Sequence, residues 1–329
     1  MSGTALRDLN TLPGSERKSE SSSKGSFARP CTGSIDENAD KSQRKISFSL
    51  VSAPVNGEEA VNAGAEAGNA EVEYIESENL TDVEDVDTAV KTLVDGLGSK
   101  DWVVVCESLN NTRRLSKFHK ETVLDMLVDV IPLIVKSLKN PRSAVCKTAI
   151  LTSSDIFNAY NDYIIDSLDP LLVQLLLKAS QDKRFVCEAA DKALVVMTTQ
   201  VSPTLLLPKL QPYLKNRNPR IRAKASICFS RSVSQLGLEG IKSYGIDKLI
   251  QDAASQLSDQ LPESREAART LLLELQTVYE KSTDLTPIVS EHPELSSWEH
   301  FCQSKLSPLS AQAVLRVTNV AREGIVLGS

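Results

Sequence analysis

Cysteine is the residue type in this chain best suited to binding a metal or acting as a nucleophile. The six cysteines are far apart in the sequence, and no two of them form a CxxC pair: Cys31, Cys106, Cys146, Cys187, Cys228 and Cys302. Only three histidines accompany them. This spacing favours buried, reduced thiols over zinc ligands or a disulfide framework. We therefore expect no metal site, and a protein of the cytosol or the nucleus.

Motifs of the common enzyme classes are missing from the sequence. It contains no GxxxxGK[ST] phosphate loop, no GxSxG nucleophile turn and no HExxH helix. The paired acids Glu58 and Glu59 lie in a polar stretch that cannot fix their positions, and His119 falls in a link between predicted helices. His292 and His300 lie near the C-terminus. We expect no catalytic residue, no cofactor and no enzymatic activity.

Noncovalent recognition is the chemistry that the remaining residues favour. Trp102 follows Lys100 and Asp101, where a turn gives way to an apolar run. A tryptophan on an exposed turn beside basic side chains is typical of an interface anchor surrounded by steering charges. The alternative is that Trp102 folds back onto the first helix, and that charged turns are ordinary solvent-exposed turns.

Internal repeats identify the elements that must position these residues. Five segments share one pattern, starting at Val104, Val145, Val186, Ile221 and Ser264. A small residue follows four positions after each start, and a large apolar residue eleven positions after it, except at Ser232. An amphipathic helix is predicted before each segment, at about 86–97, 122–139, 163–179, 203–215 and 246–258. Pro132, Pro170 and Pro212 are expected to kink or start three of these first helices.

Helical pairs repeating about every 40 residues are the signature of HEAT and armadillo arrays. We predict an all-α, HEAT/armadillo-like solenoid whose core forms by stacking, with an irregular helical bundle as the alternative. The turns inside the pairs should then line up along one edge. Four of the five turns are basic, and the fifth contains Asp259 and Glu263 ahead of Arg265. The candidate binding residues are Lys100, Trp102, Arg142, Ser143, Lys183, Arg184, Phe185, Arg217, Arg220 and Arg265.

The two ends of the chain differ from the repeats. Residues 1–81 are rich in Ser and Gly and acidic, and we expect a disordered tail. Residues 282–329 are predicted to form a helical cap on the last repeat through Trp298, Phe301 and Leu306, with a separate binding motif as the alternative. Ser47, three residues after Arg44, is a candidate phosphorylation site or a chance serine. The acidic segment is either an autoinhibitor of the basic edge or a solubilising linker.

Several of these motifs together resemble a TOG domain of the type found in CLASP and crescerin proteins. They are Asp101-Trp102 followed by Val105, Ser108 and Leu109; Arg142-Ser143 before Val145; Lys183-Arg184-Phe185 before Val186; and SREAARTLL from Ser264. The resemblance covers about residues 82–281. It implies a HEAT array whose turn edge binds the αβ-tubulin dimer or the microtubule lattice. The chain departs from the family at Val105, where Arg is frequent, and in its acidic fifth turn.

The resemblance predicts a microtubule-associated protein that regulates microtubule dynamics or organisation, located on cytoplasmic microtubules, with the nucleus as an additional site. A single such domain argues against processive polymerisation. Two other classes stay open: a HEAT scaffold that binds another protein through its helical face, and a nucleic-acid-binding protein. Exposed apolar residues on the turn edge would favour tubulin over a scaffold. The helical body carries a small excess of bases, so nucleic acid is disfavoured. We expect no membrane partner.

Overall fold

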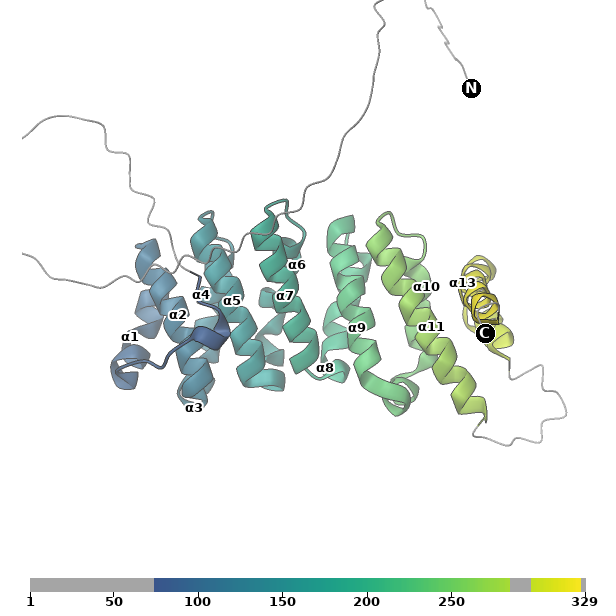
Figure 1. The fold of residues 1–329 in the computed structure, drawn as a ribbon, viewed down its shortest axis with the longest axis horizontal. Coiled ribbons are helices and arrows are strands. Elements are labelled where there is room, and N and C mark those ends of the chain that lie inside the picture. Colours follow the sequence, from purple (N-terminus) through teal and green to yellow (C-terminus); the bar gives the residue numbers. More distant parts are fainter. Residues whose placement is uncertain (1–73, 285–296, 327–329) are drawn as a thin grey trace, which may run out of the picture. The chain divides into compact units, whose positions relative to one another are not determined.

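The computed structural model describes residues 74–284 and 297–326, which all lie within one compact unit, Gly68–Ser329. Every element in the described ranges is helical. The helices form successive pairs that follow one another in chain order (Figure 1). Each pair consists of a first helix, a turn and a second helix.

Three of the five first helices consist of two shorter segments, whereas the second helices are long. The first helices are α1 (Val86–Gly98), α3 (Lys120–Leu124) with α4 (Leu127–Leu138), the 3-10 helix η2 (Asn161–Ser167) with α6 (Leu168–Ala179), α8 (Pro203–Leu210) with the 3-10 helix η3 (Gln211–Lys215), and α10 (Ile246–Gln256). The second helices are α2 (Trp102–Phe118), α5 (Ser143–Tyr160), α7 (Arg184–Gln200), α9 (Pro219–Tyr244) and α11 (Pro262–Asp284).

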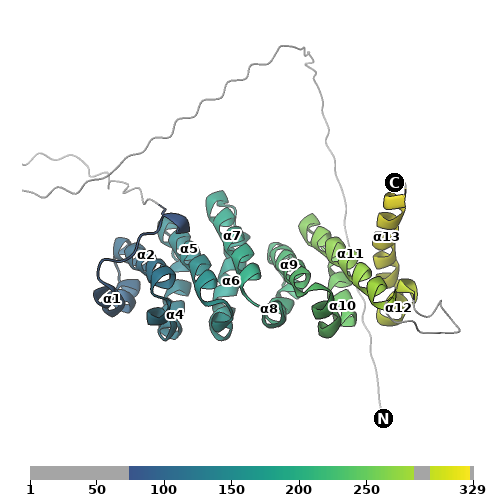
Figure 2. The ribbon, with the colours of Figure 1, turned by 60° about the horizontal axis from the view of Figure 1, so that its bottom comes forward.

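The second helices pack on one another in the order α2, α5, α7, α9, α11, and form one layer above the first helices in Figure 2. The repeated small positions lie inside this stack: Ser108, Ala149, Ala190, Ala225 and Ala268. The repeated large positions, and Ser232 with them, are also buried. No helical pair could bury these faces alone, so stacking creates the core. The predicted all-α HEAT-like fold is confirmed.

Close approach of helices explains why the pattern requires small residues. A Cβ atom added to Gly96 of α1 would lie 2.1 Å from the Oγ of Ser108 on α2. That distance is far inside van der Waals contact, so the first pair depends on glycine facing serine.

The predicted first helices differ from the observed ones in their continuity. The segment predicted at 122–139 is interrupted at Asp125 and Met126, and the segment at 203–215 continues as a 3-10 helix in which Pro212 is near the start. Proline lacks the N–H that would continue the α-helical ladder. Pro132 lies inside α4 instead of at a break, and Pro170 lies in the first turn of α6.

The residues just before α1 pack on the second-helix layer, and we call Tyr74–Leu80 the N-terminal strap. The Ser77 hydroxyl donates to Asp155 Oδ1 at 2.5 Å, and Lys117 Nζ donates to the Ser77 carbonyl at 2.6 Å. Leu80 is buried. The predicted tail, residues 1–81, therefore includes this packed strap, in which the acids Glu76 and Glu78 continue the acidic composition of the residues before it. Residues 1–73, including Ser47, lie outside the described residues.

The carboxylate that binds the strap also belongs to a buried ion pair. Arg113 Nε of α2 donates to Asp155 Oδ2 of α5 at 2.6 Å, and the Arg113 side chain has no exposed surface. Arg113 Nη1 also donates to Asn110 Oδ1 at 3.1 Å. Asp155 thus joins the second and first repeats to the strap through one carboxylate.

The C-terminal pair, α12 (Trp298–Lys305) and α13 (Pro308–Val326), packs on α10 and α11. The ring centroid of Tyr279 on α11 lies 5.5 Å from that of Trp298 and 4.6 Å from that of Phe301. Trp298 Nε1 donates to Thr318 Oγ1 at 3.3 Å, and Leu306 packs against the same core. These contacts are the ones that a cap on the last repeat requires.

No helix within the described ranges is both long and apolar enough to cross a membrane. The most apolar predicted segment forms α4, on which Asp129 and Lys136 are exposed.

Candidate partner-binding edge

The turns inside the five pairs lie along the upper edge of the helices in Figure 1. We call this surface the turn edge, and define it as residues 98–102, 139–143, 180–185, 215–220 and 258–265. It contains every residue that the sequence predicted for partner binding. The predicted alignment of the turns is therefore observed.

Short polar side chains fix the backbone of each turn by local hydrogen bonds. Asp101 caps α2 by accepting from the Val103 N–H at 2.9 Å, and Asn218 caps α9 by accepting from the Arg220 N–H at 3.0 Å. Asn140 accepts from the Arg142 N–H at 2.9 Å. Aspartate and asparagine favour such caps because their oxygens satisfy N–H groups that have no partner within the helix. The basic residues that follow are thus carried on ordered turns.

Contacts between successive turns join them into a continuous ladder. The Arg142 guanidinium lies 5.2 Å from the centroid of the Trp102 ring, and Lys183 Nζ donates to Ser143 Oγ at 3.1 Å. Arg220 Nη1 forms an ion pair with Asp182 at 2.6 Å. Arg222 Nε does the same with Asp259 at 2.5 Å. The first three contacts link successive turns and the fourth links the first turn of α9 to the fifth turn, so the edge is one surface instead of five separate loops.

Trp102 is neither fully buried nor held clear of the protein. It is the first residue of α2, and its half-buried side chain packs against the core below. Arg142 covers part of the ring from the neighbouring turn. The next two residues, Val103 and Val104, are 49% and 38% exposed. The start of α2 therefore presents an apolar surface beside a cation.

An aromatic and cationic cluster lies near the middle of the turn edge. Phe185, in the first turn of α7, is 43% exposed. Lys147 Nζ of α5 lies 3.9 Å from the ring centroid of Tyr74 and 5.9 Å from that of Phe185. Cation–π contacts of this kind contribute about 0.5–1 kcal/mol at exposed sites. Tyr74 and Lys147 were missed from the sequence, since neither lies in a turn.

The predicted basic residues divide into two groups. Lys100, Arg142, Lys183 and Arg217 are exposed, and so are Arg184 and Arg220, although these last two also form exposed ion pairs with Glu188 and Asp182. Arg265 differs, because it is half-buried and donates to the carbonyls of Asp259 and Gln260 at 2.7 and 2.8 Å. Its geometry supports a role in holding the fifth turn. Arg222 does the same for the fourth turn by donating to the Asn216 carbonyl at 2.8 Å.

The exposed ion pairs of Arg184 and Arg220 are weak and can be exchanged. Surface pairs contribute about 0–1 kcal/mol, so a partner can exchange them for its own carboxylates. The second, third and fourth turns carry a net positive charge, whereas Lys100 of the first turn is balanced by Asp101, and the fifth turn has two acids, Asp259 and Glu263, against Arg265.

Cys106, Cys146 and Cys228 of the second helices are buried thiols with suppressed reactivity, whereas Cys187 of α7 is partly exposed. Burial raises the pKa of Cys228 to about 12 and also raises the pKa of the Cys106 and Cys146 thiols. A thiol with a raised pKa has little thiolate at neutral pH and is a poor nucleophile and metal ligand. In residues 74–284 and 297–326, no group of three or more His, Cys, Asp or Glu side chains is placed to hold a metal ion.

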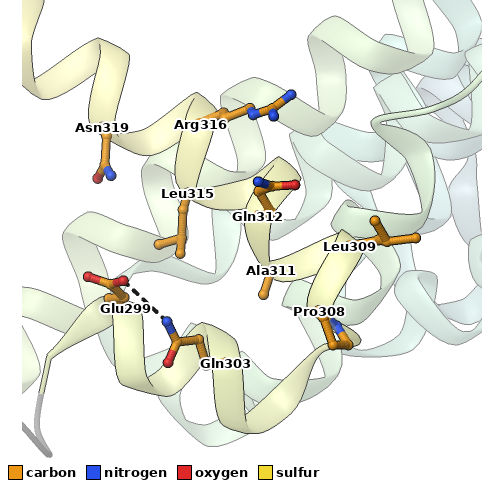
Figure 3. A pocket seen from close by; sticks show the side chains of 9 residues that line it. All are labelled: Glu299, Gln303, Pro308, Leu309, Ala311, Gln312, Leu315, Arg316 and Asn319. Atoms are coloured by element: carbon orange, nitrogen blue, oxygen red, sulfur yellow. Dashed lines mark hydrogen bonds between the residues drawn. The ribbon is translucent and has the colours of Figure 1, made fainter.

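A separate groove lies between α12 and α13 (Figure 3). Leu309, Ala311 and Leu315 form its apolar part, and Leu309 is 81% exposed. Gln303 Nε2 donates to Glu299 Oε1 at 3.2 Å on one wall. The groove belongs to the C-terminal pair and contains no residue of the turn edge.

The helical repeats match known proteins in sequence. The family model described as CLASP N terminal matches residues 108–286. TOG array regulator of axonemal microtubules protein 1 from Mus musculus is 28% identical over 206 residues, which are 61% of this chain and 12% of the mouse protein. The protein of the same name from Homo sapiens is 35% identical over 107 residues, which are 32% of this chain and 6% of the human one. The chain therefore spans only a small part of the curated relatives it matches.

Solved TOG domains have the same fold. A structure of crescerin, described as using a TOG domain array to regulate microtubules in the primary cilium, superposes with a TM-score of 0.50 at 16% identity, covering 70% of this chain and 88% of the other. The TOG domain of C. elegans Zyg9 superposes with a TM-score of 0.50 at 15% identity, covering 75% of this chain and 91% of the other.

Proposed function

Because the chain belongs to the CLASP N-terminal family, we propose that it is a microtubule-associated protein that regulates microtubule dynamics or organisation. It binds αβ-tubulin or the microtubule lattice through the turn edge. The observation that carries the proposal is the ladder of contacts from Trp102 to Asp259, which holds exposed cations and apolar side chains on one continuous surface. No catalytic step is part of this function.

The physical basis is electrostatic steering followed by contact with an apolar anchor. Tubulin is acidic, so a row of exposed Lys and Arg side chains raises the rate of encounter. The half-buried Trp102, with Val103 and Val104 beside it, then supplies apolar surface at one end of the row. Arg142 fixes the Trp102 ring before the partner arrives, which lowers the entropy lost on binding.

Exposed apolar residues lie both at the turn edge and on the helices. Val103, Val104 and Phe185 lie in the first turns of α2 and α7, beside the turn edge. The first helices of three successive repeats also carry exposed apolar side chains: Val128 on α4, Tyr163 on η2 and Leu205 on α8. A scaffold that binds through the helical face is therefore the second candidate function, and the family and the basic turns are what favour tubulin.

The names of the relatives support microtubules as the partner. The mouse and human relatives are named as regulators of axonemal microtubules, and the crescerin structure is described in terms of microtubules of the cilium. We place this chain on cytoplasmic microtubules. A nuclear site stays a prediction.

The experiment is co-sedimentation of the full-length chain with microtubules, beside size-exclusion chromatography with unpolymerised tubulin. Each is repeated with Lys183→Glu/Arg184→Glu on the turn edge. The matched control is Lys242→Glu/Lys248→Glu, at the opposite ends of the helices where α9 leads into α10. We expect the first variant to lose binding, most strongly at low salt, because exposed charges are screened beyond about 8–10 Å at physiological ionic strength. Equal losses in the two variants would show unspecific charge attraction, and no binding by the wild-type chain would refute the function.

A further inference from the structure

The starts of three successive first helices carry exposed apolar side chains. Val128 is the second residue of α4, Tyr163 the third of η2 and Leu205 the third of α8. Their exposed fractions are 72%, 77% and 41%. Because η2 packs on both α4 and α8, the three side chains belong to adjoining repeats. A run of exposed apolar side chains across adjoining repeats is typical of a surface on which a partner packs.

Exposed aspartates lie beside these apolar side chains. Asp129 follows Val128, and Asp125 is three residues before it. Asp166 is three residues after Tyr163 in η2, and residues three apart in a 3-10 helix project to the same side. Within residues 74–284 and 297–326, none of the three aspartates forms an ion pair. We call this surface the first-helix patch, and define it as Asp125, Val128, Asp129, Tyr163, Asp166 and Leu205.

The bases of these first helices lie at their other ends. Lys136 and Lys178 are in the last turns of α4 and α6. Near the patch, Lys209 is already paired with Asp169 at 2.6 Å, and Lys120 is exposed at the start of α3. The patch therefore has an excess of negative charge. A helix dipole favours acids at a helix start, but it acts on charges alone and does not explain the exposed apolar side chains among them.

The first-helix patch and the turn edge lie at opposite ends of the first helices. In Figure 1, α3 and α8 are at the lower ends of the helical pairs, away from the turn edge. Helix α4 has 12 residues, which corresponds to a length of about 18 Å. This length exceeds the Debye length of about 8 Å at physiological ionic strength, so the negative patch does not screen the basic turns. One chain therefore has separate surfaces for two partners.

We infer that the first-helix patch binds a basic segment of a partner protein, in which apolar side chains alternate with Lys or Arg. A negative surface repels nucleic acid, anionic lipid and acidic tubulin, so charge complementarity selects a basic polypeptide. Its apolar side chains pack on Val128, Tyr163 and Leu205, and its cations pair with the three aspartates. This role rests on the scaffold named above as the second candidate function, and it does not depend on tubulin binding.

Fluorescence anisotropy of labelled synthetic peptides measures this binding to the full-length chain. Packed helices lie about 8–10 Å apart, and in a polyproline II chain every third side chain faces the same way at intervals of about 9 Å. The probe therefore has leucine at every third position and lysine at the others. The control peptide has glutamate in place of lysine. We expect the lysine peptide to bind, more tightly at low salt, and the glutamate peptide not to bind. Absence of binding by the lysine peptide at low salt would overturn the inference.

Variants at exposed positions test whether the peptide binds at the patch. Tyr163→Ser removes apolar surface, and Asp125→Asn/Asp129→Asn removes charge without changing size. Each should weaken binding of the lysine peptide at least severalfold. The matched control is Asp95→Asn/Glu107→Gln, two exposed acids of the first repeat, which should leave the affinity unchanged. Equal losses in the patch and control variants would show unspecific charge attraction and overturn the inference.

Tubulin binding and self-association are measured on the same proteins. The patch variants should keep wild-type tubulin affinity, because the turn edge is intact, and a loss of that affinity would overturn the separation of the two surfaces. If the chain binds the lysine peptide through the patch but does not bind tubulin, the tubulin function fails and the patch stands. Sedimentation velocity should show no self-association that depends on the patch. Self-association that the patch variants abolish would make a second copy the occupant and overturn the basic partner segment.

Discussion

Asp155→Ala removes the carboxylate that neutralises Arg113, a side chain with no exposed surface. Leaving a buried charge without its partner costs about 3–5 kcal/mol. The same change removes the acceptor of the Ser77 hydroxyl, a net loss of about 0.5–1.5 kcal/mol. For a domain of this size each kcal/mol corresponds to about 2–4 °C, so we expect the melting temperature to fall by at least about 7 °C.

Urea unfolding followed by circular dichroism measures the change in the free energy of unfolding. Glu188→Ala is the matched control, because it breaks an exposed ion pair that contributes about 0–1 kcal/mol. Ser77→Ala separates the strap from the ion pair, since it leaves Arg113 and Asp155 together. A loss below about 1 kcal/mol for Asp155→Ala would refute the reasoning, because Arg113 would then have another way to be neutralised or hydrated.

Three further changes test the packing of the repeats by the same unfolding measurement. Gly96→Ala should destabilise the chain, because overpacking against Ser108 costs about 1–3 kcal/mol, whereas the better helix propensity of alanine returns only roughly 1 kcal/mol. Adding Ser108→Ala should restore the stability. A loss that persists in the double variant would contradict the close contact. Ser232 Oγ is buried with no hydrogen-bond partner among the described residues. Ser232→Ala should therefore stabilise the chain by about 1–2 kcal/mol. A destabilised variant would show that the hydroxyl does have a hydrogen-bond partner. Burial raises the pKa of Cys228 from 9.0 to about 12, so the native thiol keeps a proton that the unfolded chain loses above pH 9.0. The free energy of unfolding should therefore be unaffected below pH 9.0 and fall as the pH rises toward 12. The fall should be less steep in Cys228→Ala, and identical slopes in the two proteins would contradict this.

Local signals explain why most of the fold could be predicted from the sequence. Helix starts depend on caps a few residues away, such as Asp101 and Asn218, and these are visible in the chain. The buried small positions repeat at fixed spacing, as Ala149 and Ala190 show, so the stacking face was also visible. Because the turns of such an array must line up, the position of the candidate edge followed from the fold.

Contacts between distant residues explain what could not be predicted. Arg113 and Asp155 are 42 positions apart, and Ser77 is 78 positions from Asp155. No sequence pattern pairs them, so the strap was assigned to the acidic tail. Lys147 was missed for a similar reason, because its role depends on Tyr74 crossing α5. The structural role of Arg265 was hidden too, since its acceptors are backbone carbonyls.

The tubulin affinity of Trp102→Ala tests the central claim most directly. If the half-buried ring anchors the turn edge on tubulin, its loss should weaken binding by about 2 kcal/mol or more, near thirtyfold. Val128→Ala is the control, because Val128 is 72% exposed on α4 and outside the turn edge. Affinity measured by titrating the folded full-length proteins with unpolymerised tubulin should fall for Trp102→Ala and stay unchanged for Val128→Ala. Wild-type affinity in a folded Trp102→Ala chain would contradict the account.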